Sequence, residues 1–421
     1  MNTFTLIFLA ALFASLALEF WLAKRHAHHV RTHRDRVPEE FSGVITPETH
    51  RKAADYTLAK LKVIEAGRAW NAVLLLIFTL GGGIDAIDHG LDRFDLGPIS
   101  HGVTLILTVM LLMSLAELPL SIYQTFVVEE KFSFNRTTPA QFVKDLLLQG
   151  ALSLAIGAPL LALILWVMES AGPWWWVIAW AILMGFSLLM SWAYPTLIAP
   201  LFNKFTPLED AQLRARIQRL LQRCGFKSQG IFVMDGSRRS GHGNAYFTGL
   251  GSNKRIVFFD TLMEALEPEE LEAVLAHELG HFKRRHVIKM LLTSAVLSFA
   301  GLALLGWLAQ QPWFYEGLGV SRPSNATALL LFMLILPVFS TFLQPVLAWI
   351  QRKYEFEADE FAAALTGADP LVRSLVKLYR DNAATLTPDP LYAAFHYSHP
   401  PAAIRIAHLK RAGGKRETVA A

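Results

Sequence analysis

Seven long apolar segments constrain the fold of this chain more than any other feature of its sequence. Each approaches or exceeds the roughly 20 residues that an α-helix needs to cross a lipid bilayer. Hydrocarbon offers no hydrogen-bond partners, so a spanning segment must satisfy its own backbone, as a helix does. The composition agrees, since 53% of the residues are hydrophobic and 18% are charged. The sequence therefore predicts an all-α polytopic membrane protein, with spans at residues 4–23, 70–87, 103–127, 146–168, 174–193, 287–309 and 326–350.

Basic residues are unevenly distributed among the connections between these segments. The connection after the first span is rich in Lys and Arg, whereas the one after the second span is acidic apart from Arg93. Cytoplasmic loops carry the excess of Lys and Arg. Lys24 and Arg25 directly follow the first span, which favours a retained anchor over a cleaved signal peptide. We therefore expect the N-terminus outside and the C-terminus in the cytoplasm, in a bacterial inner membrane or the endoplasmic reticulum membrane.

Other features of the sequence argue against nucleic-acid binding, against disulfides and against a metal site elsewhere in the chain. The net charge of +4 is modest and no basic block is interleaved with aromatic residues, so no nucleic-acid partner is expected. The single cysteine, Cys224, excludes an intramolecular disulfide or a cysteine metal cage. The histidines of the connection at 24–69 are interspersed with arginines that repel a cation, which favours a solvated loop over a metal site. These histidines are His26, His28, His29 and His33.

The pattern His277-Glu278-Leu279-Gly280-His281 is the strongest indication of chemistry. Residues four apart lie on one face of a helix, so both imidazoles can reach a single ion. Glu278 follows the first histidine and can take a proton from a water molecule that the ion activates. Pro268 suits the first turn of such a helix. The alternative is a surface helix that carries two histidines by chance.

A catalytic zinc site needs a third protein ligand. The metzincin pattern would require glycine at 284 and histidine at 287, where this chain has Arg284 and Val287. An intramembrane protease of the site-2 type would place an Asp-Gly pair downstream, but Asp235-Gly236 lies upstream. Neither pattern supplies the missing ligand.

Acidic residues just beyond the last span are better candidates for that ligand. The last two spans form an antiparallel pair, so the end of the second returns to the membrane face where His281 lies. On a continuing helix Glu355 and Asp359 share one face, so one can bind zinc while the other orients a ligand histidine. Glu357 and Glu360 point elsewhere on that helix. Spacing alone does not choose between these acids, and a charged helix end at the membrane surface remains the alternative.

Residues 205–286 form the largest soluble block, and we expect a small α+β unit there. The pattern predicts a helix at 209–223, a strand at 230–235, and a hairpin of strands 244–249 and 255–259 around a turn at 251–254. The hairpin either offers an edge for an extended peptide or only supports the zinc helix. We divide the chain into spans one to five (1–204), a metalloprotease core (205–286), spans six and seven (287–350), and a C-terminal helical part with the third ligand (351–421).

Six stretches of the chain together resemble the integral-membrane zinc endopeptidases that process CAAX proteins. Gly243 departs from the serine that this family often has before Asn-Ala-Tyr. The matching stretches are residues 277–281 (HELGH), 355–359 (EFEAD), 126–135 (FVVEEKFSFN), 201–208 (LFNKFTPL), 244–247 (NAYF) and 398–401 (SHPP) followed by Arg405.

The resemblance implies a hollow barrel of seven membrane helices around a chamber, with one Zn²⁺ per chain facing into it. It assigns His277, His281 and Glu355 as zinc ligands and Glu278 as the general base. Of the other residues, Asp359 would support a ligand and His399 would contact the oxyanion, with Arg405 bracing that region. Asn244 and Ala245 would hold the peptide, which groups them with Arg405 as substrate-binding residues. Glu117 would face the chamber, although a buried hydrogen bond near Pro119 explains it equally well.

The resemblance also implies a substrate, the C-terminal tripeptide of a prenylated CAAX protein. The expected partners are a peptide or protein, possibly prenylated, and the lipid bilayer. Two alternatives stand beside this one. The first is a general quality-control protease for membrane proteins. The second is a non-catalytic membrane protein with a structural zinc, which would need four protein ligands and no base.

Overall fold

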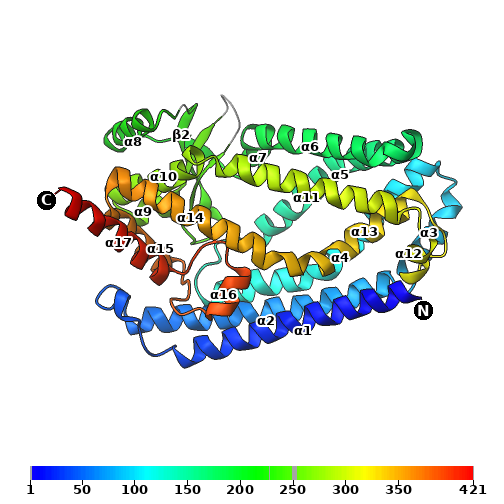
Figure 1. The fold of residues 1–421 in the computed structure, drawn as a ribbon, viewed down its shortest axis with the longest axis horizontal. Helices are drawn as coiled ribbons and strands as arrows, with labels where there is room; N and C mark the ends of the chain where they lie inside the picture. The colour runs from blue at the N-terminus through cyan, green and yellow to red at the C-terminus, as the bar shows by residue number, and fades with distance from the viewer. Residues whose placement is uncertain (1, 227, 249–253, 421) are drawn as a thin grey trace.

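Long helices make up most of the computed structural model, which describes residues 2–226, 228–248 and 254–420 (Figure 1). Two of the long helices, α2 and α5, begin at a threonine followed by proline, a pair that caps the first turn and fits its geometry. Thr46 and Thr138 are such caps, and each hydroxyl accepts a hydrogen bond from the amide three residues on. The helices of the first half are α1 (Thr3–Thr32), α2 (Pro47–Phe78), α3 (Gly83–Leu91), α4 (Pro98–Tyr123), α5 (Pro139–Ser170), α6 (Trp175–Ala193) and α7 (Ala199–Phe202).

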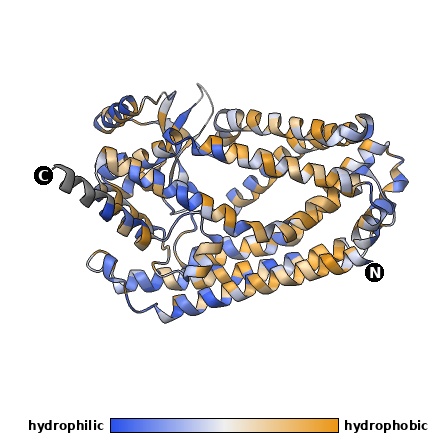
Figure 2. Cartoon of the chain, viewed as in Figure 1, coloured by the Kyte–Doolittle hydropathy of each residue, from blue (hydrophilic) through white to orange (hydrophobic). Residues whose placement is uncertain are grey.

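Among the described residues, six helices are long and apolar enough to cross a membrane, and a bent pair raises the number to seven. Figure 2 shows hydrophobic residues along the middle of these helices and hydrophilic residues near the C-terminal end of the molecule. The two termini lie at opposite ends (Figure 1). The six helices are Thr3–Thr32, Pro98–Glu129, Pro139–Ser170, Gly172–Phe202, His286–Leu308 and Asn325–Thr366.

The second predicted span is broken rather than continuous. Its two parts are α2 and the segment from α3 to Phe94, bent by 51°. Gly82 adopts φ +74°, a left-handed conformation that side chains disfavour. A Cβ atom at Gly81 would lie 2.7 Å from the carbonyl oxygen of Ile77. The glycine triplet that weakened the sequence prediction therefore produces a sharp break in the helix.

The polar connection predicted at 24–69 is much shorter than expected, because α1 continues to Thr32 and α2 begins at Pro47. His26, predicted to lie in a solvated loop, is buried on α1. Its Nδ1 accepts a hydrogen bond of 3.2 Å from the backbone amide of Asp389, and its ring stacks on Tyr392 at 4.1 Å. The end of α1 therefore contacts the C-terminal region.

A four-stranded sheet in the order β1-β2-β4-β3 forms the base of the soluble part. The hairpin prediction is confirmed, since β3 pairs antiparallel with β4. Most of its predicted turn falls in 249–253, outside the described residues. Two features were not predicted: a strand that ends at Pro207, and the parallel pairing of β2 with β4. The strands are β1 (Phe205–Pro207), β2 (Gly230–Met234), β3 (Ala245–Thr248) and β4 (Arg255–Phe259).

Two helices of the soluble part approach each other unusually closely. They are α10 (Pro268–Lys283), which carries the HExxH pattern, and α14 (Gln344–Thr366), which continues the last span. A Cβ atom at Gly280 would lie 2.9 Å from the Cα of Ala358. Glycine at this position therefore lets the two helix backbones touch.

The remaining elements include the spans that contain α11 and α13, and shorter elements that cover this pair or connect the spans. The helices are α8 (Ala211–Cys224), α9 (Asp260–Ala265), α11 (His286–Leu308), α12 (Pro312–Gly317), α13 (Asn325–Ser340), α15 (Ala368–Asp381), α16 (Pro390–His396) and α17 (Ala402–Ala420). Short 3₁₀ and π turns are η1 (Glu39–Phe41), η2 (Asp92–Phe94), η3 (Gln124–Glu129), η4 (Gly172–Trp174), η5 (Tyr194–Ile198), η6 (Gly236–Arg238) and η7 (Thr341–Leu343).

Candidate active site

The HExxH helix, α10, is defined by strong signals at its start. Glu267 and Glu270 form a reciprocal capping box, and Pro268 occupies the first turn. The helix places His277 and His281 on one face, one turn apart. Their Nε2 atoms lie 3.3 Å from each other. The two imidazoles therefore converge on one point.

Glu355 of α14 reaches the same point from the neighbouring helix. One carboxylate oxygen lies 3.4 Å from Nε2 of His277, and the other lies 3.4 Å from Nε2 of His281. A tetrahedral zinc ion with bonds of about 2.0–2.1 Å separates its donors by about 3.3 Å. Oε2 of Glu355 is buried and accepts no hydrogen bond from any described residue. The three side chains fit a divalent metal of this geometry.

Asp359 and Arg405 support this centre from behind. Nδ1 of His277 lies 2.9 Å from Oδ1 of Asp359, which is fully buried. Arg405 donates from Nε to Oδ2 at 2.8 Å and from Nη2 to Oδ1 at 2.5 Å. A carboxylate that accepts a hydrogen bond from Nδ1 of a ligand histidine fixes the tautomer of that ring and orients its Nε2 toward a metal. Arg405 is buried, and its ion pairs are with Asp359 and, at 3.7 Å, with Glu355.

The charge of these acids affects His277. Burial opposes the charged imidazole, but the hydrogen bonds to Asp359 and Glu355 outweigh it and raise the pKa of His277 to about 9. A pKa raised in this way means that the carboxylates favour a positive charge at the point where the ligands meet.

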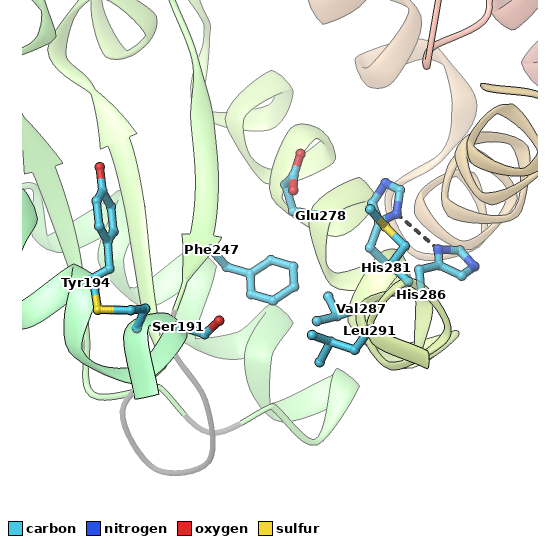
Figure 3. A pocket seen from close by; sticks show the side chains of 10 residues that line it. Ser191, Tyr194, Phe247, Glu278, His281, His286, Val287 and Leu291 are labelled. Carbon is cyan, nitrogen blue, oxygen red and sulfur yellow. Dashed lines mark hydrogen bonds between the residues drawn. The ribbon is translucent and has the colours of Figure 1, made fainter. Parts of the chain in front are cut away.

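Glu278 opens into a pocket of about 570 Å³ beside the centre. In Figure 3 the ring of Phe247 extends from β3 toward the middle of this pocket. Burial raises the pKa of the Glu278 carboxyl, although His277 and His281 oppose the shift. A carboxylate with a raised pKa is a better proton acceptor. The pocket is lined by Met190, Ser191, Tyr194, Phe247, Glu278, His281, His286, Val287, Met290 and Leu291.

His399 lies at the exposed rim of the centre. Its side chain is 61% exposed, and its Nε2 is 3.3 Å from Oε1 of Glu355. Ser398 lies within hydrogen-bond distance of its other ring nitrogen, at 2.9 Å. His399 can therefore reach a group that approaches the metal from the solvent side.

Ala245 is the first residue of β3, the terminal strand of the sheet, and Asn244 directly precedes it. The side chain of Asn244 accepts a hydrogen bond of 2.8 Å from the amide of Ala245. An edge strand of this kind can pair with an extended peptide. Glu117, the remaining acid of interest, is exposed on α4.

Sequence reasoning missed one residue of the site. His286 of α11 contacts His281, with their Nδ1 atoms 3.0 Å apart, and it also contacts Glu357. The sequence showed a third histidine five residues after His281. It did not show the contact of His286 with Glu357, because that contact depends on how α11 and α14 pack. Glu357, expected to point elsewhere than the third ligand, lies with its Oε2 atom 3.0 Å from Nε2 of His286.

Comparison with known proteins identifies the family. The model of "CAAX prenyl protease N-terminal, five membrane helices" matches residues 26–204, and that of peptidase family M48 matches residues 207–412. The chain belongs to the CAAX prenyl protease group of peptidase family M48. It is therefore a multi-pass membrane metalloendopeptidase, and the family implies a bound metal.

Relatives from several kingdoms match almost the full chain. CAAX prenyl protease 1 homologues from Oryza sativa and Homo sapiens are 34% and 32% identical, and the matches cover 92% and 96% of this chain and 94% and 95% of theirs. The crystal structure of S. mikatae Ste24p superposes with a TM-score of 0.90 at 32% identity, covering 97% of this chain and 99% of that one. The predicted membrane fold with a small protease sheet is thus confirmed.

Proposed function

We propose that this protein is a zinc endopeptidase whose metal is held by His277, His281 and Glu355. The observation that carries the proposal is the convergence of these three donors at 3.3–3.4 Å from one another. When bound, zinc supplies a Lewis acid that acidifies water and polarises the scissile carbonyl. Three protein ligands leave a position open for chemistry, unlike a closed structural site with four.

The side chains around the metal take the other roles. Glu278 accepts the proton of the attacking water on its carboxylate and passes it to the leaving nitrogen. His399 donates a hydrogen bond from Nε2 to the developing oxyanion, a contribution on the order of 10²–10³ in rate for a single donor elsewhere. Asp359 holds His277, and Arg405 neutralises and orients Asp359.

The substrate chain lies along β3 in this proposal. An extended peptide pairs with the outer edge of β3, beginning at Asn244 and Ala245, which brings its carbonyl past Glu278. The relatives are named CAAX prenyl proteases, so we propose a prenylated CAAX protein as substrate, with removal of its last three residues. The apolar lining of the pocket beside Glu278 suits the aliphatic residues of such a tail.

We further propose that the zinc centre faces the cytoplasmic side, with the N-terminus outside. The proposal rests on the basic residues at the ends of α1 and α2 nearest the centre and the acidic residues near α3 at the opposite end. The protease core then comprises residues 205–286 and 351–421, linked by spans six and seven.

The test compares the purified wild type with Glu278→Gln on quenched peptides, farnesylated or not, and measures zinc in both. We expect about one zinc per chain in each protein, and a fall in kcat of about 10²–10⁴ for the variant because it lacks the base. Faster cleavage of the farnesylated peptide would support the CAAX substrate. Equal cleavage of both peptides would favour general turnover, and zinc without any cleavage would favour a structural site. Equal activity of the two proteins would show that Glu278 is not the base.

A further inference from the structure

His286 is a buried histidine that touches a proposed metal ligand and is not itself a ligand. It is the first residue of α11, and its side chain is 1% exposed. Its Nδ1 lies 3.0 Å from Nδ1 of His281, a contact drawn as a dashed line in Figure 3. Its Nε2 lies 3.0 Å from Oε2 of Glu357 on α14. His286 therefore connects a ligand to a carboxylate.

The chemistry of His281 and Glu357 determines where the hydrogens lie along the row His281–His286–Glu357. Nε2 of His281 must present a lone pair to the metal, so the hydrogen of its neutral ring lies on Nδ1. That hydrogen is donated to Nδ1 of His286, which places the hydrogen of the second ring on Nε2. Glu357 can only accept, and it receives this second hydrogen. Each group thus has one possible role, and the row ends on a negative charge.

We propose that His286 and Glu357 are positioning residues, which hold His281 in the tautomer and orientation that bind the metal. Metal-binding histidines commonly donate their second N–H to a carboxylate or carbonyl. Here an imidazole stands between the ligand and the carboxylate. The inference rests on the proposed zinc site, and it adds two residues that act on the metal through His281.

The backbone and the neighbouring ring fix the place of His286. Arg285, between α10 and α11, adopts φ +56°, a left-handed conformation that turns the chain back toward α10. The ring of Tyr354 stacks on His286 at 4.3 Å with an interplanar angle of 13°. Lys289 lies 3.7 Å from Glu357, and the positive charge of Arg284 also acts on this carboxylate. The imidazole is thus held by a turn, a stacked ring and two hydrogen bonds.

The two histidine ligands are consequently supported in different ways. His277 contacts Asp359 directly, and that carboxylate is fully buried. His281 depends on Glu357, whose side chain is 40% exposed, through a second ring. Substitution of the solvent-accessible Glu357 should therefore change the affinity for the metal.

The experiment measures the zinc dissociation constant of the full-length protein by competition with a chromophoric chelator. We expect His286→Phe, which keeps a ring against Tyr354, and Glu357→Ala to weaken zinc binding about 10–100-fold. His286→Asn retains a polar atom where Nδ1 lies and should recover part of this loss. The matched control is Glu360→Ala, because Glu360 lies on the same helix, is 51% exposed and pairs with a histidine, His408, at 3.2 Å. It should bind zinc like the wild type.

Each outcome separates the inference from the proposed function. If the wild type holds no zinc, the proposed function fails. If the wild type holds zinc and both His286→Phe and Glu357→Ala bind it equally well, the proposed function stands and the positioning role is wrong. If His286→Phe does not fold, Glu357→Ala decides alone, with its thermal midpoint compared to that of Glu360→Ala. Equal losses in Glu357→Ala and Glu360→Ala would also contradict the inference.

Discussion

Among single residues, Arg405 is a buried cation whose charge is balanced by the buried carboxylate of Asp359. It is 6% exposed, and its guanidinium makes two parallel hydrogen bonds to Asp359. Burial opposes the charge, but Asp359 outweighs it and raises the pKa of Arg405 above its ordinary value. Buried ion pairs add little net stability when intact, whereas removing one partner leaves an uncompensated charge. Arg405 and Asp359 therefore have to be considered together.

This pairing predicts the effect of Asp359→Asn. The variant removes the nearer of the two carboxylates beside the buried guanidinium, since only Glu355 remains, 3.7 Å away. It also turns one of the two acceptor oxygens that serve Arg405 and His277 into an amide NH2, which donates. We expect a loss of about 3–5 kcal/mol in the free energy of unfolding and a zinc affinity about 10–100-fold lower. Denaturant unfolding and chelator competition measure the two effects. Asp369→Asn, at an exposed aspartate of α15, is the control, and equal behaviour of the two variants would contradict the prediction.

Among the elements, the contact between α10 and α14 determines whether the three proposed metal ligands meet. His277 and His281 come from one helix and Glu355 from the other. Gly280, between the two histidines, leaves no space for a side chain against Ala358. Packing and ligand geometry thus depend on the same residue.

Gly280→Ala should therefore force the two helices apart. The added Cβ meets backbone atoms at 2.9 and 3.1 Å, which cannot rotate away. We expect a destabilisation of about 1–3 kcal/mol, as for other overpacked interiors, together with reduced zinc content. Gly157→Ala on α5 is the control, because nothing lies within 4 Å of its added Cβ. Thermal unfolding and metal analysis of both variants check the expectation, and an unchanged Gly280→Ala protein would refute it.

Local patterns in the sequence predicted much of this arrangement. Hydropathy located the long helices, and the spacing of His277 and His281 placed them on one helix face. The sequence left several acids open as the third ligand, because its choice depends on the contact between α10 and α14. The role of His286 and the burial of His26 were not predicted for the same reason: both depend on packing between segments that are distant in the chain. The break after Phe78 was visible as a glycine triplet, but its angle was not.

At the scale of the whole molecule, the proposed metal centre and the turns around α3 lie at opposite ends of the long helices (Figure 1). Cys224 is the only cysteine of the chain and is buried. Cysteines introduced at exposed positions can therefore be labelled selectively, which allows a direct test of the proposed orientation.

Two serines provide that test. Ser42, between α1 and α2, and Ser100, in the first turn of α4, are both exposed and lie on opposite sides in the proposed topology. In a Cys224→Ala background expressed in a bacterial inner membrane, a thiol reagent that cannot cross that membrane should label Ser100→Cys in intact cells and Ser42→Cys only after the cells are opened. Alkylation after solubilisation controls for reactivity. The reverse pattern would invert the topology, and labelling of both in intact cells would contradict it.

The last span and the proposed metal ligand Glu355 belong to one helical segment, which runs from Asn325 to Thr366. Glu355 lies near one end of it, and α11 starts only five residues after His281. Helices tilt when the thickness of the surrounding hydrocarbon changes. A tilt of α11 and of the segment that ends in α14 would move the ends of these helices. It would therefore shift Glu355 relative to His277 and His281. We therefore expect the acyl-chain length of the host membrane to affect the rate of peptide cleavage through the geometry of the proposed metal site.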